Sequence, residues 1–86
     1  GATMHHLRNS AGSREIDLIV EDLKGNLVAI EVKASITVNE DDAKHLRWFQ
    51  KEQGAKVKAA VILYAGHNVL RLRDGVIALP ISSLWA

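Results

Sequence analysis

The chain has 86 residues, no cysteine, and 11 basic against 10 acidic residues, which gives a formal net charge of +1. A chain this short forms one small domain or a piece of one, and it buries only about 60% of the surface that its unfolded form exposes. Without cysteine, a disulfide-stapled scaffold, a cysteine zinc site and thiol chemistry are excluded. The near-neutral charge is not typical of a nucleic-acid coat or a membrane-surface protein.

Targeting signals and membrane segments are also missing from the sequence. No apolar run approaches the roughly 20 residues needed to span a bilayer. The first residues, GATMHHLRNS, lack the hydrophobic stretch of a signal peptide. We therefore expect a cytoplasmic protein with no membrane partner. We take Gly1 to Thr3 as a cloning remnant and expect a single domain over residues 4–86.

Residues 14–35 predict a β-hairpin. Alternate residues of each arm are apolar and share one face of their strand: Ile16, Leu18 and Val20 in the first arm, Val28, Ile30 and Val32 in the second. A three-residue loop, residues 23–25, brings the two sets together and puts Gly25 where a left-handed residue is needed. This register places Ile16 opposite Val32. On the other face it places Asp17 opposite Glu31, with Cβ atoms roughly 5 Å apart.

A helix is predicted from Asn39 to Gln53. Asn39 and Asp42 have the spacing of a capping box, and Gly54 supplies a C-terminal stop. Helical spacing predicts an inward stripe formed by Ala43, Leu46, Phe49, Gln50 and Gln53. One side of this helix is basic and is formed by Lys44, Arg47 and Lys51. Trp48 falls opposite the inward stripe, which is unusual for so large an apolar residue.

The run AAVILYAG within residues 57–66 predicts a strand that is buried on both faces, as in a parallel sheet. A strand, a helix and a buried strand in succession imply a right-handed crossover. Asp74-Gly75 then predicts a two-residue hairpin turn that pairs Leu72 with Ile77 and Leu70 with Leu79.

The last residues, Ile81 to Trp85, predict a short helical turn. We expect Leu84 and Trp85 on this turn to cover the core. Together with the hairpin, the helix and the buried strand, this completes an α/β fold with a mixed sheet.

The spacing Asp17-x13-Glu31-Val32-Lys33 is the main chemical signal. Two carboxylates on one face of adjacent strands can share a hard cation such as Mg²⁺. A lysine beside them can neutralise a phosphate or orient a water. Alternatively, these side chains form a solvated face with weak cross-strand pairs. Because the same face carries Ile19, Leu27 and Ala29, we place the charged residues at the edge of a covered surface.

The run REIDLIVEDLKGNLVAIEVKAS resembles motifs two and three of the PD-(D/E)XK superfamily, which has the restriction-endonuclease-like fold. More narrowly, residues 6–85 are similar to a C-terminal domain of unknown function attached to prokaryotic AAA-type ATPases. The segments IEVKAS, VILYAG and LPISSLW carry this second resemblance. It implies a restriction-endonuclease-like core of hairpin, helix, parallel strand and terminal hairpin that lacks the first helix, in the C-terminal fragment of a longer ATPase.

The resemblance also implies roles for particular residues. Mg²⁺ or Mn²⁺ would be bound by Asp17, Glu31 and the backbone carbonyl of Val32. Lys33 would be the catalytic lysine, and Gln50 would point from the helix toward the site. No phosphate-binding G-x-x-x-x-G-K-[ST] motif is present, so this chain has no ATP site of its own.

We therefore expect an accessory nuclease-like domain of an AAA-type ATPase that hydrolyses phosphodiester bonds of DNA or RNA with a divalent metal. The alternative is an inactive module that binds nucleic acid or docks onto a protein. In both cases the ATPase domain of the parent chain is an expected partner. Without the first helix, one sheet face is left uncovered, and we expect the chain to self-associate.

Overall fold

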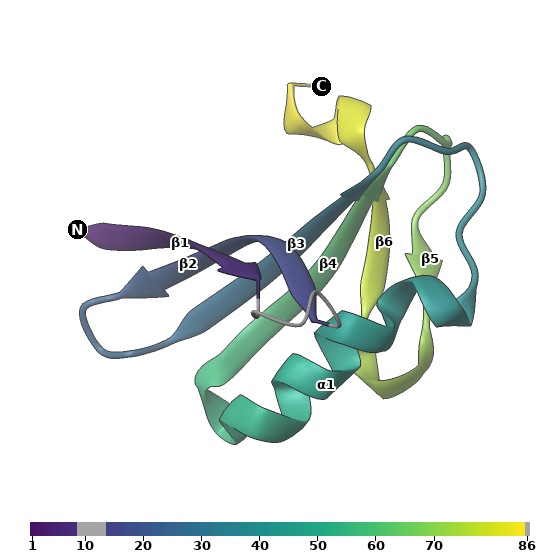
Figure 1. Ribbon diagram of the computed structural model, residues 1–86. Coiled ribbons are helices and arrows are strands. Elements are labelled where there is room, and N and C mark those ends of the chain that lie inside the picture. The colour runs from purple at the N-terminus through teal and green to yellow at the C-terminus, as the bar shows by residue number, and fades with distance from the viewer. Residues whose placement is uncertain (9–13, 86) are drawn as a thin grey trace.

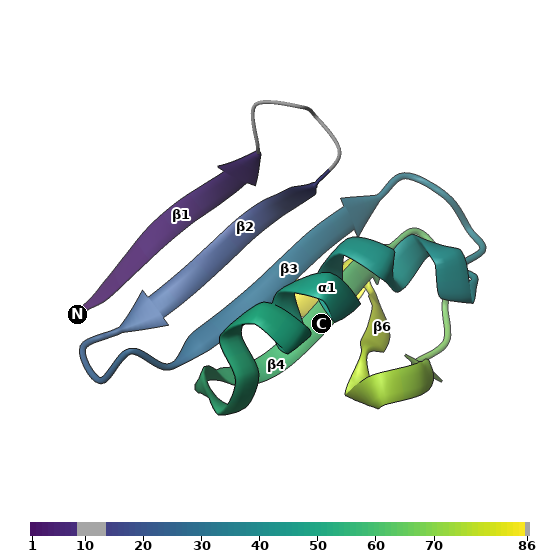
Figure 2. The same cartoon turned by 60° about the horizontal axis from the view of Figure 1, so that its bottom comes forward.

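The computed structural model describes residues 1–8 and 14–85. These residues form one six-stranded mixed sheet in the order β1-β2-β3-β4-β6-β5 (Figure 1). The strands are β1 (Ala2–Arg8), β2 (Glu15–Asp22), β3 (Leu27–Lys33), β4 (Val57–Tyr64), β5 (Leu70–Arg71) and β6 (Ile77–Pro80). One α-helix, α1 (Lys44–Gln53), lies across one face of the sheet (Figure 2). The predicted α/β class with a mixed sheet is confirmed.

The hairpin of β2 and β3 follows the predicted loop. The backbone N–H of Asp22 donates to the carbonyl of Asn26 (3.0 Å), which encloses three loop residues. Gly25 has the expected left-handed conformation, with φ of +84°. Beyond the loop, Val20 pairs with Val28, as the sequence predicts.

The predicted pairing of Ile16 with Val32 is wrong. The ladder between β2 and β3 ends before Ile16, which lies opposite Leu7 of β1 instead. Between the Ile19 and Ile16 pairs the register of β2 against β1 shifts by one residue, which is a β-bulge. The bulge moves Ile16 to the face of Ile19, where it is fully buried in the core. At the same point Oδ2 of Asp17 accepts the N–H of Val32 at 2.7 Å, and Val32 is 52% exposed.

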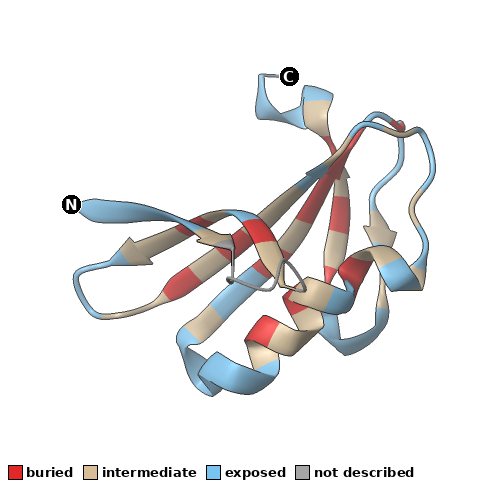
Figure 3. Ribbon diagram, viewed as in Figure 1, coloured by how far each residue is buried: buried red, intermediate tan, exposed pale blue. Residues whose placement is uncertain are grey.

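The helix α1 covers the face of the sheet opposite to Leu18, Val20, Val28 and Ile30. Its Leu46 and Phe49 pack into one cluster with residues from four strands: Ile16, Ile19, Leu27, Ala29, Ala60, Ile62, Tyr64 and Ala78. The other face remains without a covering element among the described residues and, apart from the buried Leu63, carries half-buried or exposed side chains (Figure 3). This uncovered face is formed by Leu18, Val20, Val28, Ile30, Val32, Val61, Leu63, Ile77 and Leu79.

The capping box at the start of the helix is confirmed. Asn39 Oδ1 accepts the N–H of Asp42 (3.2 Å), and Asp42 Oδ2 accepts the N–H of Asn39 (2.8 Å). The first turn is a 3₁₀ segment, η1 (Glu40–Ala43), and a second one, η2 (Gly54–Lys56), follows α1. Gln53 does not belong to the buried stripe, because its side chain is exposed near this helix end.

Strand β4 occupies the middle of the sheet, parallel to β3 on one side and to β6 on the other. Ile62 and Tyr64 belong to the core beneath α1, and Leu63 is buried toward the uncovered face. The apolar run therefore forms the central parallel strand that the sequence predicts. Just beyond it, Gly66 lies so close to its surroundings that a Cβ there would overlap the Tyr64 ring and lie 2.9 Å from the carbonyl oxygen of Ile36.

The predicted register of the terminal hairpin is wrong by one residue. Leu72 donates its N–H to the carbonyl of Val76 (2.8 Å) rather than pairing with Ile77. Leu70 likewise pairs with Ala78 rather than with Leu79. The loop is therefore three residues long and forms the short segment η3 (Arg73–Gly75).

Core packing explains this register. A one-residue shift moves every side chain of a strand to the other face of the sheet. In the observed register Leu70 and Leu72 lie on the side of Val76 and Ala78, which are fully buried in the core. Asp74 adopts φ of +60°, and the glycine after it also has positive φ, so the Asp-Gly pair suits the longer loop as well.

The chain ends in a 3₁₀ turn, η4 (Ile81–Leu84), as predicted. The expected packing of this turn is wrong, because Leu84 is 62% exposed and Trp85 is 75% exposed. The turn leaves the sheet on the side away from α1 (Figures 1 and 2), so its apolar residues cannot reach the core. In the part of the chain that the structure describes, no helix is both long and apolar enough to cross a bilayer.

Candidate functional site

Four carboxylates surround the end of β3 that leads toward the helix. We call Glu15, Asp17, Glu31 and Asp42 the carboxylate cluster. Burial and, after it, the negative charges of Asp17, Glu15 and Asp42 together raise the pKa of Glu31 to about 7. Burial and the neighbouring carboxylates disfavour the ionised form of Glu31, so a bound cation would stabilise that form.

Asp17 lies within this cluster because its carboxylate is tied to β3. Its Oδ2 accepts the N–H of Val32 at 2.7 Å, and Val32 is the residue that follows Glu31 in β3. Its backbone carbonyl accepts a hydrogen bond from Nδ1 of His6 on β1 (3.1 Å). The side chain is otherwise exposed, so the carboxylate remains open to solvent.

Lys33 lies two residues beyond Glu31 on the same strand, and therefore on the same face. Its Nζ is 2.5 Å from Oδ2 of Asp42, in a partly buried ion pair. Burial alone would raise the pKa of Asp42, but hydrogen bonds from Lys33 and from the N–H of Asn39 outweigh it and lower the pKa. The capping box thus holds Asp42 in position as the partner of the lysine.

The cluster offers ligands for a hard cation without enclosing one. Among residues 1–8 and 14–85, no three His, Cys, Asp or Glu side chains are placed as a ready ligand set for a metal. Mg²⁺, however, commonly uses one or two protein carboxylates and completes its shell with water and substrate phosphate. Asp17 and Glu31 fit that pattern, and the role of the Val32 carbonyl as a third ligand stays a prediction.

The structure does not bring Gln50 to these carboxylates. Its Nε2 donates to the backbone carbonyl of Asp74 in η3 at 3.0 Å. Its Oε1 is buried without a hydrogen-bond partner in the described residues. A role for Gln50 beside Glu31 therefore requires another side-chain rotamer and stays a prediction.

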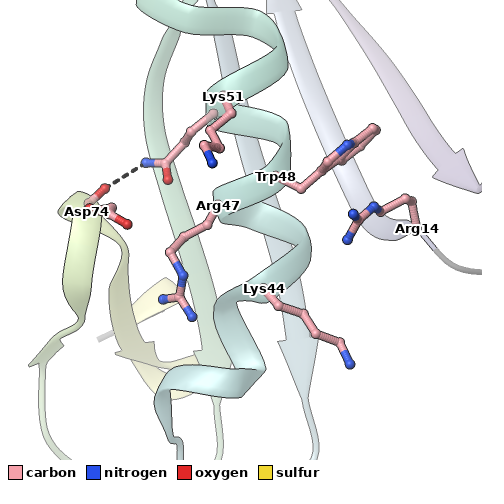
Figure 4. Close-up of a pocket in the computed structure, with 7 residues that line it drawn as sticks. Arg14, Lys44, Arg47, Trp48, Lys51 and Asp74 are labelled. Atoms are coloured by element: carbon pink, nitrogen blue, oxygen red, sulfur yellow. Dashed lines mark hydrogen bonds between the residues drawn. The ribbon is translucent and has the colours of Figure 1, made fainter.

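A groove of about 650 Å³ lies over the exposed side of α1 (Figure 4). We call it the basic groove; it is lined by Arg14, Lys44, Arg47, Trp48, Gln50, Lys51 and Asp74. The guanidinium carbon of Arg14 lies 5.2 Å from the centroid of the Trp48 ring. The sequence signals were the basic flank of the helix and the outward Trp48, but the contribution of Arg14 could not be inferred from spacing.

Comparison with known proteins gives the family. Residues 1–84 match the model of a family described as a domain of unknown function, DUF4143, so the chain belongs to that family. No curated protein and no solved structure matches the chain.

Proposed function

We propose that this chain is a nuclease-like domain in which Asp17 and Glu31 bind Mg²⁺ or Mn²⁺ for the hydrolysis of phosphodiester bonds in DNA or RNA. The observation that supports this most strongly is the half-buried Glu31, whose pKa is raised to about 7 beside three other carboxylates. The resemblance of β2 and β3 to the PD-(D/E)XK motifs supports the same proposal. The similarity to ATPase-attached domains supports an accessory role in an AAA-type ATPase.

Each residue has a chemical task in this proposal. Asp17 and Glu31 supply oxygen ligands, and the bound cation supplies charge neutralisation at the phosphate and lowers the pKa of water. Lys33 carries a positive charge on the same face, where it can stabilise the negative charge that develops on the phosphoryl oxygens. Asp42 keeps the ammonium group within this region through the 2.5 Å ion pair.

Calorimetric titration with Mn²⁺, followed by a cleavage assay with Mg²⁺ or Mn²⁺, tests the proposal. Asp17→Asn and Glu31→Gln should each abolish metal binding, because the amides carry no charge. Lys33→Ala should keep metal binding but lose most of the turnover, by about 10²-fold or more. Glu52→Gln is the matched control, since Glu52 is an exposed carboxylate of α1 away from the cluster.

Two results would overturn the proposal. A chain that neither binds Mn²⁺ nor cleaves nucleic acid has no such site. Cleavage that survives all three substitutions would come from a contaminant rather than from these residues.

The second candidate is an inactive module that binds nucleic acid or docks onto the ATPase domain. One observation favours it: Lys33 already has a carboxylate partner at 2.5 Å, which lowers its availability to a phosphate. Metal binding without cleavage in the assay above would select this second candidate.

A further inference from the structure

The basic groove concentrates positive charge that the chain as a whole does not have. Four of its lining side chains are basic and one, Asp74, is acidic. The entire chain carries a formal net charge of only +1. Such a local excess of positive charge attracts polyanions and increases their local concentration.

Among the residues that the structure describes, most of this charge is not neutralised. Arg47 is the exception, since its Nη1 lies 3.0 Å from Oε1 of Glu40. Lys44 has only a long contact of 3.9 Å to Asp41, and that carboxylate is 81% exposed. Lys51 is exposed and has no ion-pair partner among the described residues. Lys44 and Lys51 are therefore available to phosphates.

An aromatic ring lies among these cations. Trp48 is only partly buried and packs against the core, so it lies beside the buried stripe of α1 and not opposite to it as predicted. Figure 4 shows its ring extending from the helix toward Arg14, whose guanidinium lies over the ring. Cations that follow a groove, with aromatic or guanidinium planes between them, are the combination that binds unpaired bases and their phosphates.

The groove also borders the carboxylate cluster along the chain. Arg14 precedes by one residue the strand β2 that carries Asp17. Lys44, at the start of α1, follows Asp42 by two residues. Two residues of the groove are therefore close in sequence to residues of the carboxylate cluster.

We propose that the basic groove binds single-stranded nucleic acid, with Lys44 and Lys51 on the phosphates and a base stacked on the Trp48–Arg14 pair. A single strand is favoured over a duplex because stacking requires a base that is free of its own neighbours. This inference rests on the proposed function only for the hydrolysis of the bound nucleic acid. Binding itself needs no metal.

Fluorescence anisotropy with a dye-labelled oligothymidylate, in low salt and with EDTA, tests the inference. The Lys44→Ala/Lys51→Ala double variant should weaken binding by about tenfold or more and reduce the slope of log affinity against log salt by roughly 1.4. The control is Lys24→Ala/Lys58→Ala, which removes two exposed lysines of the hairpin loop and of β4 and should leave the affinity unchanged.

The stacking contact has its own measurement. In a Trp85→Phe background Trp48 is the remaining tryptophan, so its fluorescence should be quenched when the oligonucleotide binds. Trp48→Leu should weaken binding by about fivefold or more, while Trp48→Phe keeps a ring and should bind within a few fold of the original chain. Circular dichroism of Trp48→Leu shows whether the fold is kept; if it is not, the quenching experiment decides.

Three outcomes would overturn the inference: no binding, equal binding of a duplex of the same length, or equal losses in the lysine pair and its control. The cleavage assay separates the two proposals. A chain that binds the strand in EDTA but cleaves nothing contradicts the hydrolysis and keeps the groove. Cleavage that does not depend on Lys44, Lys51 or Trp48 contradicts the groove alone.

Discussion

Among the described residues, folding changes the pKa of Glu31 the most. Its pKa rises from 4.5 to about 7, through burial first and then through Asp17, Glu15 and Asp42. Because the folded-state pKa lies above the unfolded one, the protonated side chain contributes stability below about pH 4.5, and this stability is lost as the pH rises through 7. Between these values the unfolded chain ionises Glu31 while the folded chain keeps it protonated, and this difference lowers the free energy of unfolding.

Replacing this group removes the pH dependence. We predict that Glu31→Gln unfolds with a free energy similar to that of the original chain at pH 5, but is more stable by about 1–2 kcal/mol at pH 8, a value reduced for partial solvent exposure. Urea unfolding at the two pH values measures the difference. Glu52→Gln should show no such change. Parallel curves for Glu31→Gln and the original chain would contradict the assignment.

The same ionisation should control metal affinity. A cation that binds Glu31 must displace its proton, so binding should release up to about one proton below pH 7. We predict that Mn²⁺ affinity rises by up to about tenfold per pH unit until pH 7 and then levels off. Calorimetry in buffers of different ionisation enthalpy measures both quantities. An affinity that is constant from pH 5.5 to 8 would show that Glu31 is not a ligand.

At the scale of elements, the capping box connects helix stability with the site. Asn39→Ala removes the acceptor for the N–H of Asp42 and should lower the free energy of unfolding by about 1 kcal/mol. Asn39→Asp keeps an acceptor and should cost much less. Urea unfolding of the two variants checks this, and an Asn39→Ala chain as stable as Asn39→Asp would show that the cap contributes little.

The elements also show what sequence patterns can predict. The β2–β3 loop was predictable because Gly25 and the period of two allowed one register. The Asp-Gly pair at 74–75 was ambiguous, since it suits two-residue and three-residue loops alike, and burial of Val76 and Ala78 decided between them. The position of Ile16 was not predictable, because a β-bulge between Ile16 and Ile19 breaks the period of two on which the register argument depends.

For the candidate site, the spacing of Asp17, Glu31 and Lys33 predicted a shared site, and this assignment stays a prediction. The ladder between β2 and β3 ends at the pair Leu18 and Ile30, so the expected pairing of Asp17 with Glu31 is not part of it. Asp42 was recognised only as a cap, because its contact with Lys33 depends on the path of residues 34–39, which has no periodic pattern. The covered face could not be chosen either, since both faces of the hairpin carry apolar residues and only the position of α1 distinguishes them.

At the scale of the whole molecule, the uncovered face is the largest feature without an assigned role. Nine aliphatic side chains from four strands lie on it, and Val32 at its edge is 52% exposed. Apolar faces of this kind commonly mark contact surfaces. We therefore propose that the 86-residue chain self-associates through this face.

Light scattering over a range of concentrations tests this association. We predict an apparent mass that rises with concentration, and a shift toward the monomer in Val32→Lys. Leu23→Lys is the control, because Leu23 is an exposed residue of the β2–β3 loop, 86% accessible and away from the face. A strict monomer at high concentration would contradict the proposal, as would an equal effect of both substitutions.

The close approach at Gly66 limits how this sequence can diverge. Any side chain there would displace the Tyr64 ring, whose hydroxyl donates to the carbonyl of Asn68 at 2.6 Å. The same contact lies against Ile36, while Ala65 donates its N–H to the carbonyl of Ser35 at 2.8 Å. The connection from β3 to the capping box therefore follows a path that leaves no room for a Cβ atom at residue 66. A relative that replaces this glycine must also have changed its tyrosine or rerouted that connection, and with it the carboxylate that faces Lys33.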